Sequence, residues 1–235
     1  MTIKNNEKSW DVVILSPHMD DAVLSLGQHI LKWKKEDKKI KIITMVNSFG
    51  ENKTIPNYSK DYVNKSGFKN VFDFEKARRE EDKMVMEKLK VDYEYWSVID
   101  ASFRSNNGYF EYPKRKDLLS GRLVKSNQKT ISNLVLKLNK IKARKVLIPY
   151  GVGKHVDHVI LKKVGERSRL KNKYYYFESP YLWEKLNWFK IVKNLFKINS
   201  FFIKVSGKNK LLRMYKSQYP LWGDNKNNYF EVVIK

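Results

Sequence analysis

The sequence contains no cysteine. A chain without cysteine forms neither disulfides nor thiolate metal sites, so any metal ion that it binds must be held by nitrogen and oxygen atoms. The sequence also lacks a run of about 20 apolar residues, the length that a membrane-spanning helix needs. Residues 1–11 are polar and show no apolar core of a signal peptide. From these absences we expect a protein of the cytoplasm.

Acidic residues are scarce relative to basic ones, with 25 Asp and Glu against 48 Lys and Arg and a net charge of +23. Such an excess favours anionic partners, such as sugar nucleotides, lipid-linked glycans or an acidic membrane surface, unless it reflects a compositional bias toward lysine. The lysines are spread along the chain, and no nucleic-acid-binding motif is present. We therefore do not expect nucleic acid as a partner.

No G-x-G-x-x-G motif follows the early apolar runs, which argues against a dinucleotide cofactor. Apolar or alternating runs predict strands at 12–15, 40–46, 93–99, 145–149, 174–178 and 229–234. Apolar residues at helical spacing predict helices at 22–35, 73–90, 131–141 and 156–164, with Asp73 capping the second of them. Residues 52–72 and 100–122 show no clear period and are expected to be loops beside the site, where Arg104 could face an anionic substrate.

The alternation of strands and helices predicts an α/β fold. We expect a single Rossmann-like domain over residues 1–235, with a mostly parallel sheet and helices on both faces. In such folds the functional site lies at the carboxyl ends of the strands.

Histidine is also rare, and three of the four histidines fall in two short motifs. The motif Ser-Pro-His-Met-Asp-Asp at 16–21 ends the first predicted strand, where Asp20 or Asp21 can cap the following helix. The motif His-Val-Asp-His at 155–158 follows the strand at 145–149. A lone histidine is usually a helix cap or a surface residue, but two such clusters at strand ends predict a metal site. We expect His18, Asp21 and His158 to be the ligands, and Asp20 to remain free to accept protons.

These residues resemble the LmbE/PIG-L-like metal-dependent deacetylases. The first motif resembles that family's P-H-P-D-D signature and the second its H-P-D-H signature. The helix with Arg78 and Glu81 before Leu89 is similar to the family's R-x-x-E helix, and residues 208–218 are similar to its late K…Y-x-S-Q segment. Departures from the family pattern remove no presumed ligand; they are Met19 and Val156 in place of proline, Ala22 in place of glutamate, and Ser25 and Gln28 in place of glycine.

The resemblance implies hydrolytic N-deacetylation of an N-acetylglucosamine-type sugar, which releases acetate and a free amine. It implies Zn²⁺, or another divalent ion such as Fe²⁺, as the cofactor. Asp20 would be the general base, His155 when protonated would stabilise the oxyanion, and Asp157 would orient His155. Arg78 would contact or support the substrate, unless Arg78 and Glu81 form a surface ion pair.

Two alternatives remain open at this point. One is amide hydrolysis on another metabolite, such as a glycosylated thiol precursor or an antibiotic intermediate. The other is a catalytically idle, basic protein that binds a glycan or nucleic acid. Residues 182–198 form a basic, tryptophan-containing amphipathic pattern, which predicts a helix that either packs on the sheet or lies at an anionic membrane surface.

Overall fold

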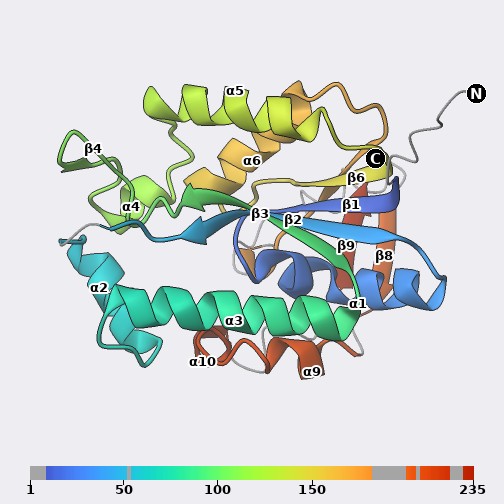
Figure 1. Ribbon diagram of the computed structural model, residues 1–235, viewed down its shortest axis with the longest axis horizontal. Helices are drawn as coiled ribbons and strands as arrows, with labels where there is room; N and C mark the ends of the chain where they lie inside the picture. Colours follow the sequence, from blue (N-terminus) through green and yellow to red (C-terminus); the bar gives the residue numbers. More distant parts are fainter. Residues whose placement is uncertain (1–8, 52–53, 182–199, 205–206, 223–229) are drawn as a thin grey trace, which may run out of the picture.

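A seven-stranded sheet forms the centre of the protein (Figure 1). The computed structural model describes residues 9–51, 54–181, 200–204, 207–222 and 230–235. The strand order is β3-β2-β1-β6-β7-β9-β8. The first five strands in this order pair in parallel, and β9 runs antiparallel to both β7 and β8. The strands are β1 (Trp10–Ser16), β2 (Ile40–Ser48), β3 (Asp92–Ile99), β6 (Ala143–Pro149), β7 (Lys173–Tyr176), β8 (Ser200–Lys204) and β9 (Phe230–Ile234); β4 (Ser105–Asn106) and β5 (Tyr109–Phe110) form a separate ribbon.

The order of the parallel strands reverses between β1 and β6. Strands β2 and β3 follow β1 on one side, whereas β6 and β7 lie on the other. In open α/β sheets the crevice for ligands opens where the order reverses, at the carboxyl ends of the strands. One histidine motif begins at the end of β1 and the other follows β6 after residues 150–154, so the fold brings both motifs to the edge where the carboxyl ends of these strands lie.

Helices cover both faces of the sheet (Figure 1). Helices α5 and α6 lie on one face, and α1, α3, α9 and α10 lie on the other. The helices are α1 (Asp21–Lys35), α2 (Asn57–Lys65), α3 (Val71–Leu89), α4 (Arg115–Leu118), α5 (Ser126–Leu138), α6 (Val156–Arg167), α9 (Asn209–Leu212) and α10 (Tyr219–Trp222). The predicted α/β fold, with a mostly parallel sheet covered by helices on both faces, is therefore confirmed.

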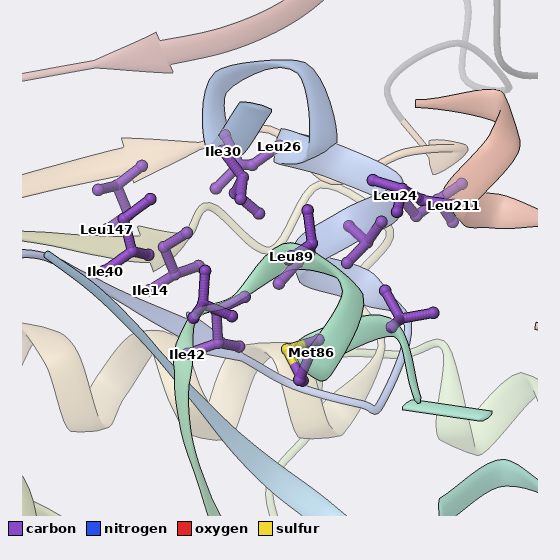
Figure 2. Close-up of a cluster of buried hydrophobic side chains, with 14 of the residues drawn as sticks. Ile14, Leu24, Leu26, Ile30, Ile40, Ile42, Met86, Leu89, Leu147 and Leu211 are labelled. Carbon is purple, nitrogen blue, oxygen red and sulfur yellow. The ribbon is translucent and has the colours of Figure 1, made fainter. Parts of the chain in front are cut away.

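The central strands are buried on both faces because each face carries its own apolar core. On the face toward α1 and α3, alternate residues of β1 and β2 pack against α1, against the C-terminal end of α3 and against α9. Figure 2 labels ten residues of this core: Ile14, Leu24, Leu26, Ile30, Ile40, Ile42, Met86, Leu89, Leu147 and Leu211. Toward α5 and α6, the intervening strand residues form a second core. A Cβ atom at Gly165 of α6 would lie 2.6 Å from Ile148, so the glycine permits the close approach of α6 to β6.

Several predicted boundaries are wrong. Helix α2 lies within the loop predicted at 52–72; it buries only Ser59 and Val63, and so few buried positions give no clear apolar period. Helix α3 begins at Val71 and is capped by Asn70, whose side chain accepts the N–H of Asp73, instead of by Asp73. Helix α5 begins five residues before the predicted helix, and β8 is not predicted at all.

Two further predictions concern the segment 182–198 and the number of domains. The amphipathic helix predicted at 182–198 lies outside the described residues, and the assignment of 1–235 to one domain stays a prediction. None of the described helices is both long and apolar enough to span a membrane.

A buried carboxylate, Asp82, joins α3 to two other parts of the fold. Its two oxygens accept hydrogen bonds from the hydroxyls of Tyr95 in β3 and Tyr215 after α9, each at 2.8 Å. Burial raises the pKa of Asp82 to about 7, and the two hydroxyls offset this only in part. Since the folded protein then binds this proton more tightly than the unfolded chain, Asp82 stabilises the fold best at low pH.

We predict that Asp82→Asn changes the pH dependence of stability. Between pH 3.8 and about 7, the contribution of Asp82 to the free energy of unfolding should fall as the pH rises, because Asp82 ionises first in the unfolded chain. This one group contributes at most about 1.4 kcal/mol per pH unit. Urea unfolding at a series of pH values should therefore show that the difference in free energy of unfolding between wild type and Asp82→Asn changes across this range, whereas the exposed control Asp61→Asn keeps the wild-type profile. Equal profiles for wild type and Asp82→Asn would contradict the assignment.

Candidate metal centre and active site

The turn between β1 and α1 is organised by the hydroxyl of Ser16. This hydroxyl donates to the carbonyl oxygen of His18 at 2.7 Å and accepts the N–H of Ala22 at 3.0 Å. Asp20 occupies the N-cap position of α1 but makes no capping hydrogen bond with its side chain. The predicted capping role of Asp20 or Asp21 is therefore wrong, because Ser16 serves the helix start. Both carboxylates remain available to the site.

Three side chains from the two motifs converge as predicted. An oxygen of Asp21, Oδ2, lies 2.9 Å from Nδ1 of His18 and 3.2 Å from Nε2 of His158. One ligand atom from each of the three residues can be chosen so that all lie within 4.8 Å of one another. Asp21 and His158 are buried, while the side chain of His18 keeps 12% of its exposure. Of the three side chains, that of His18 is therefore the most exposed to solvent.

The remaining ring nitrogens of the two histidines each face a carboxylate. Nδ1 of His158 lies 3.0 Å from Oε1 of Glu178, and Nε2 of His18 lies 3.3 Å from Oδ2 of Asp157. A histidine that binds a metal through one nitrogen usually gives its other N–H to a carboxylate or carbonyl, which fixes the tautomer and the ring orientation. Both histidines have this arrangement.

The donor set fits a divalent cation. Nε2 of His158 is buried and, among the described residues, has no hydrogen-bond partner, although Oδ2 of Asp21 lies 3.2 Å away. With the ring proton directed from Nδ1 to Glu178, Nε2 presents a lone pair to a carboxylate oxygen. Two acceptors at this distance are compatible with a shared cation, since ligand atoms of a tetrahedral zinc site are about 3.4 Å apart at zinc–ligand distances near 2.1 Å.

A second histidine and aspartate group overlaps the first but fits a cation less well. It consists of His18, His155 and Asp157. The oxygens of Asp157 are already engaged, since Oδ1 accepts from Arg104 at 2.6 Å and Oδ2 accepts the N–H of Ala101 at 3.0 Å. Arg104 also donates to the carbonyl oxygen of Ile99 and is 9% exposed. The prediction that Arg104 faces a substrate is therefore wrong; it neutralises Asp157.

The charges of the three predicted ligands depend on one another. Burial disfavours the charged form of each, yet Asp157 and Asp21 raise the pKa of His18 well above its usual value. In the same way Asp21 and Glu178 raise the pKa of His158 to about 9, and both histidines hold the pKa of Asp21 well below its usual value. Without a metal ion, both histidines therefore hold a proton beside the ionised carboxylate of Asp21. A divalent cation would replace these protons, because histidine binds zinc or iron as the neutral imidazole.

Asp20 has a different environment from its neighbour Asp21. Its Oδ2 atom accepts a hydrogen bond from Nη2 of Arg78 at 3.1 Å, and it is not part of either candidate ligand group. Burial raises the pKa of Asp20, and the positive charge of Arg78 offsets this in part. A carboxylate that is beside the candidate metal ligands, and not among them, can accept a proton during the reaction.

Arg78 does not form the surface ion pair with Glu81 that we considered from the sequence. Both residues are buried, at 4% and 6% exposure, and they bind different partners. Arg78 donates to Asp20 and to the hydroxyl of Tyr62, whereas Glu81 accepts from the backbone and side chain of Ser217. The predicted direct substrate contact of Arg78 stays a prediction, and its observed contact is with the candidate base.

His155 lies at the N-cap of α6, where its Nδ1 accepts the N–H of Asp157 at 3.3 Å. Burial, together with the positive charge of His18, lowers the pKa of His155 well below its usual value. The predicted protonated state of His155 is thus not supported by its surroundings. The backbone N–H of Asp157 is thus its observed contact with His155, and the predicted role of Asp157 in orienting His155 stays a prediction.

Sequence reasoning missed two residues of the site. Glu178 follows β7 and accepts the N–H of Gly151 at 2.7 Å in addition to bonding His158. An acidic residue just past the end of a parallel strand is the signal that could have found it. Tyr181 packs its ring edge-to-face on His158 at 5.5 Å between ring centres, and a Cβ at Gly153 would lie 2.5 Å from that ring. No sequence pattern links Tyr181 to the motifs.

We predict that Glu178→Gln weakens metal binding about 10–100-fold, the usual cost of removing a carboxylate that supports a ligand histidine. His158→Ala, which removes the ligand itself, should weaken it further. Competition with a chromophoric zinc chelator measures both affinities. Glu166→Gln, an exposed glutamate of α6, is the matched control and should bind zinc like wild type. Zinc affinity of Glu178→Gln equal to that of the control would show that His158 needs no such support.

Known proteins share this arrangement of the chain. The structure resembles the zinc-inhibited form of a teicoplanin deacetylase, with a TM-score of 0.74 and 16% identity over 97% of both chains. It resembles the deacetylase of the A40926 pseudoaglycone, with a TM-score of 0.70 and 17% identity over 95% of this chain and 96% of that one. It also resembles the N,N'-diacetylchitobiose deacetylase of Pyrococcus horikoshii, with a TM-score of 0.56 and 14% identity over 100% and 87%. At sequence identities this low, the structural similarity shows only that the fold is shared.

Sequence comparison identifies the family. No curated protein matches the chain significantly. The family model described as PIG-L, GlcNAc-PI de-N-acetylase, matches residues 13–168, which include both histidine motifs, Arg78 and Arg104. That span is about two thirds of the chain, and it begins in β1 and ends just after α6. The chain belongs to the PIG-L family.

Proposed function

We propose that this protein is a metal-dependent hydrolase that removes the acetyl group from an N-acetylated sugar. The observation that carries this proposal is the division between two adjacent carboxylates. Asp21 lies among the candidate ligands, whereas Asp20 lies beside them with a raised pKa and a single charged partner, Arg78. A binding protein without catalysis would have no need for a second buried carboxylate at this position.

His18, Asp21 and His158 would hold the metal ion, Zn²⁺ or another divalent ion such as Fe²⁺. When bound, such an ion supplies Lewis-acid polarisation and makes water more acidic. Asp20 accepts the proton of the attacking water as the new bond to the acetamide carbon forms. The carbon–nitrogen bond then breaks, and Asp20 returns the proton to the departing amine. The products are acetate and the free amino sugar.

His155 assists as a neutral hydrogen-bond donor in this scheme. Because Nδ1 accepts the N–H of Asp157, the ring proton of the neutral imidazole lies on Nε2. A donor fixed in a buried position stabilises the oxygen that becomes negative during the attack. This role needs no protonated histidine, so it is compatible with the lowered pKa of His155.

The substrate class is proposed from the family and from charge. The description of the family model, GlcNAc-PI de-N-acetylase, names a substrate that contains GlcNAc. The similar structures include a diacetylchitobiose deacetylase. We propose an N-acetylglucosamine-type sugar, including nucleotide- or lipid-linked forms. The net charge of +23 supports an anionic substituent on that sugar.

The first test of this function is acetate release. We expect release from N-acetylglucosamine, its nucleotide sugar or a lipid-linked form, measured by a coupled acetate assay. Chelation should abolish the release, and Zn²⁺ or Fe²⁺ should restore it. Full activity in protein shown to contain no metal would refute the metal centre. If the protein hydrolyses an antibiotic intermediate and none of the three sugars, its substrate is another amide and not an N-acetylglucosamine-type sugar.

A second test separates chemistry from metal binding. Asp20→Asn should keep the metal while kcat falls about 10²–10⁴-fold, the usual contribution of a general base. His155→Ala should behave similarly, whereas Asp21→Ala should lose the metal. Metal content by mass spectrometry and steady-state kinetics measure the two effects. Loss of metal from Asp20→Asn as complete as from Asp21→Ala would show that the two aspartates do not divide their tasks in this way.

A further inference from the structure

The segment 208–218 lies outside the span of the family model, yet three of its polar side chains are buried against the helices of the site. Lys208 donates to the carbonyl oxygen of Leu24 in α1 and forms an ion pair with Glu231. Ser217 donates to Glu81 of α3 from both its backbone and its hydroxyl, at 2.9 and 2.6 Å. This segment buries three polar residues, Lys208, Ser217 and Gln218, and is therefore no surface tail.

One chain of hydrogen bonds leads from this segment to Asp20. The hydroxyl of Tyr62 in α2 donates to Oε1 of Gln218 at 2.5 Å. Nη1 of Arg78 in α3 donates to the same hydroxyl at 3.2 Å, and Nη2 of Arg78 donates to Asp20 at 3.1 Å. Three consecutive bonds therefore join Gln218 to the candidate base. We call Gln218, Tyr62, Arg78 and Asp20 the relay.

The hydrogen bonds of the relay determine which atom donates and which accepts at each step. Nε2 of Gln218 donates to the carbonyl oxygen of Ser217 at 3.1 Å, which turns its Oε1 toward Tyr62. The single proton of Tyr62 is then directed to Gln218, so its lone pairs face Arg78. Burial raises the pKa of Tyr62, so the hydroxyl keeps this proton at physiological pH.

Packing leaves Arg78 little other freedom. Its guanidinium lies 5.9 Å from the ring centre of Phe49 and 5.8 Å from that of Phe74. The ring of Phe74 also meets Tyr62 edge-to-face at 5.3 Å. The two phenylalanines fix the place of the guanidinium, while the hydrogen bonds to Tyr62 and Asp20 fix its rotation.

We infer that Gln218, Tyr62 and Arg78 are positioning residues that set the orientation of the Asp20 carboxylate, and that the segment 208–218 is thereby part of the catalytic apparatus. The catalytic consequence rests on the proposed function. A small misplacement of a reacting group can lower the rate about 10²-fold. The relay is therefore expected to act on turnover and not on metal binding.

Kinetics of variants test the relay. Tyr62→Phe should lower kcat about 10–100-fold, with KM and zinc affinity within about twofold of wild type. Gln218→Leu should have the same effect in smaller measure, and it provides an independent variant should Tyr62→Phe fold poorly. Tyr58→Phe is the matched control, because Tyr58 also lies in α2 and is partly buried, but its hydroxyl donates to the carbonyl oxygen of Tyr112 and not to Arg78.

A double-mutant cycle tests whether the relay acts through Arg78. If it does, adding Tyr62→Phe to Arg78→Met should change kcat no further, because the link to Asp20 is already broken. Additive effects of the two substitutions would overturn the inference. So would a Tyr62→Phe variant with a lowered melting temperature but unchanged kcat, since that result assigns Tyr62 to stability alone.

A binding measurement separates failure of the relay from failure of the proposed function. Acetohydroxamate is the probe, since it chelates zinc and offers an N–H and O–H to a neighbouring carboxylate. Its dissociation constant for the zinc-loaded protein should rise at least fivefold in Tyr62→Phe, but should not rise further when that change is added to Asp20→Asn. This result would support the relay even in a protein that releases no acetate. An equal dissociation constant for wild type, Tyr58→Phe and Tyr62→Phe would overturn it.

Discussion

The site depends on keeping several carboxylates ionised out of water. A buried carboxylate without a partner is costly, and it stays charged only where hydrogen-bond donors or cations surround it. Asp21 lies between two histidines, and Asp157 accepts from Arg104 and a backbone N–H. Glu178 accepts from His158 and Gly151. Each of these carboxylates has at least one partner from another element or loop of the chain, so the charges are stabilised only when the strands and α6 have assembled.

This requirement explains the unusual distribution of polar residues in the fold. The face of α3 that points to the sheet carries Arg78, Glu81 and Asp82 where an amphipathic helix would normally be apolar. All three are buried, and each has a partner from another segment. The helix is held by polar contacts at its site end and by apolar packing of Val85, Met86 and Leu89 at the other.

The sequence predicts the fold and the ligand group well because both depend on local patterns. Apolar runs mark β1 and β6; one motif begins at the end of β1 and the other follows β6 after a short loop, so parallel pairing of these strands brings His18 and His158 to the same edge of the sheet. The partners that tune these residues are different. Arg104 is recognisable only once the fold is known, because nothing near it in the sequence marks it as a neighbour of Asp157. Glu178 carries only one local signal, its position just past the end of a strand.

The roles of individual atoms were equally beyond the sequence. The sequence suggests that Asp157 orients His155 but does not say through which atoms. In the structure the backbone N–H of Asp157, one of the free N–H groups at the start of α6, donates to the imidazole. The carboxylate is then free for Arg104. Likewise the serine that opens the first motif, and not one of its aspartates, serves the first turn of α1.

The carboxylate of Glu231 in β9 has a consequence for how the protein is made. It accepts the backbone N–H groups of Gln28 and His29 in the middle of α1, residues 203 and 202 positions earlier in the chain. On the ribosome, at about 5–20 residues per second, roughly 10–40 seconds separate the synthesis of the two. During that interval α1, which begins with Asp21, lacks the strand that holds its middle turn. The nascent chain therefore carries both histidine motifs for some time before its site can take its final shape.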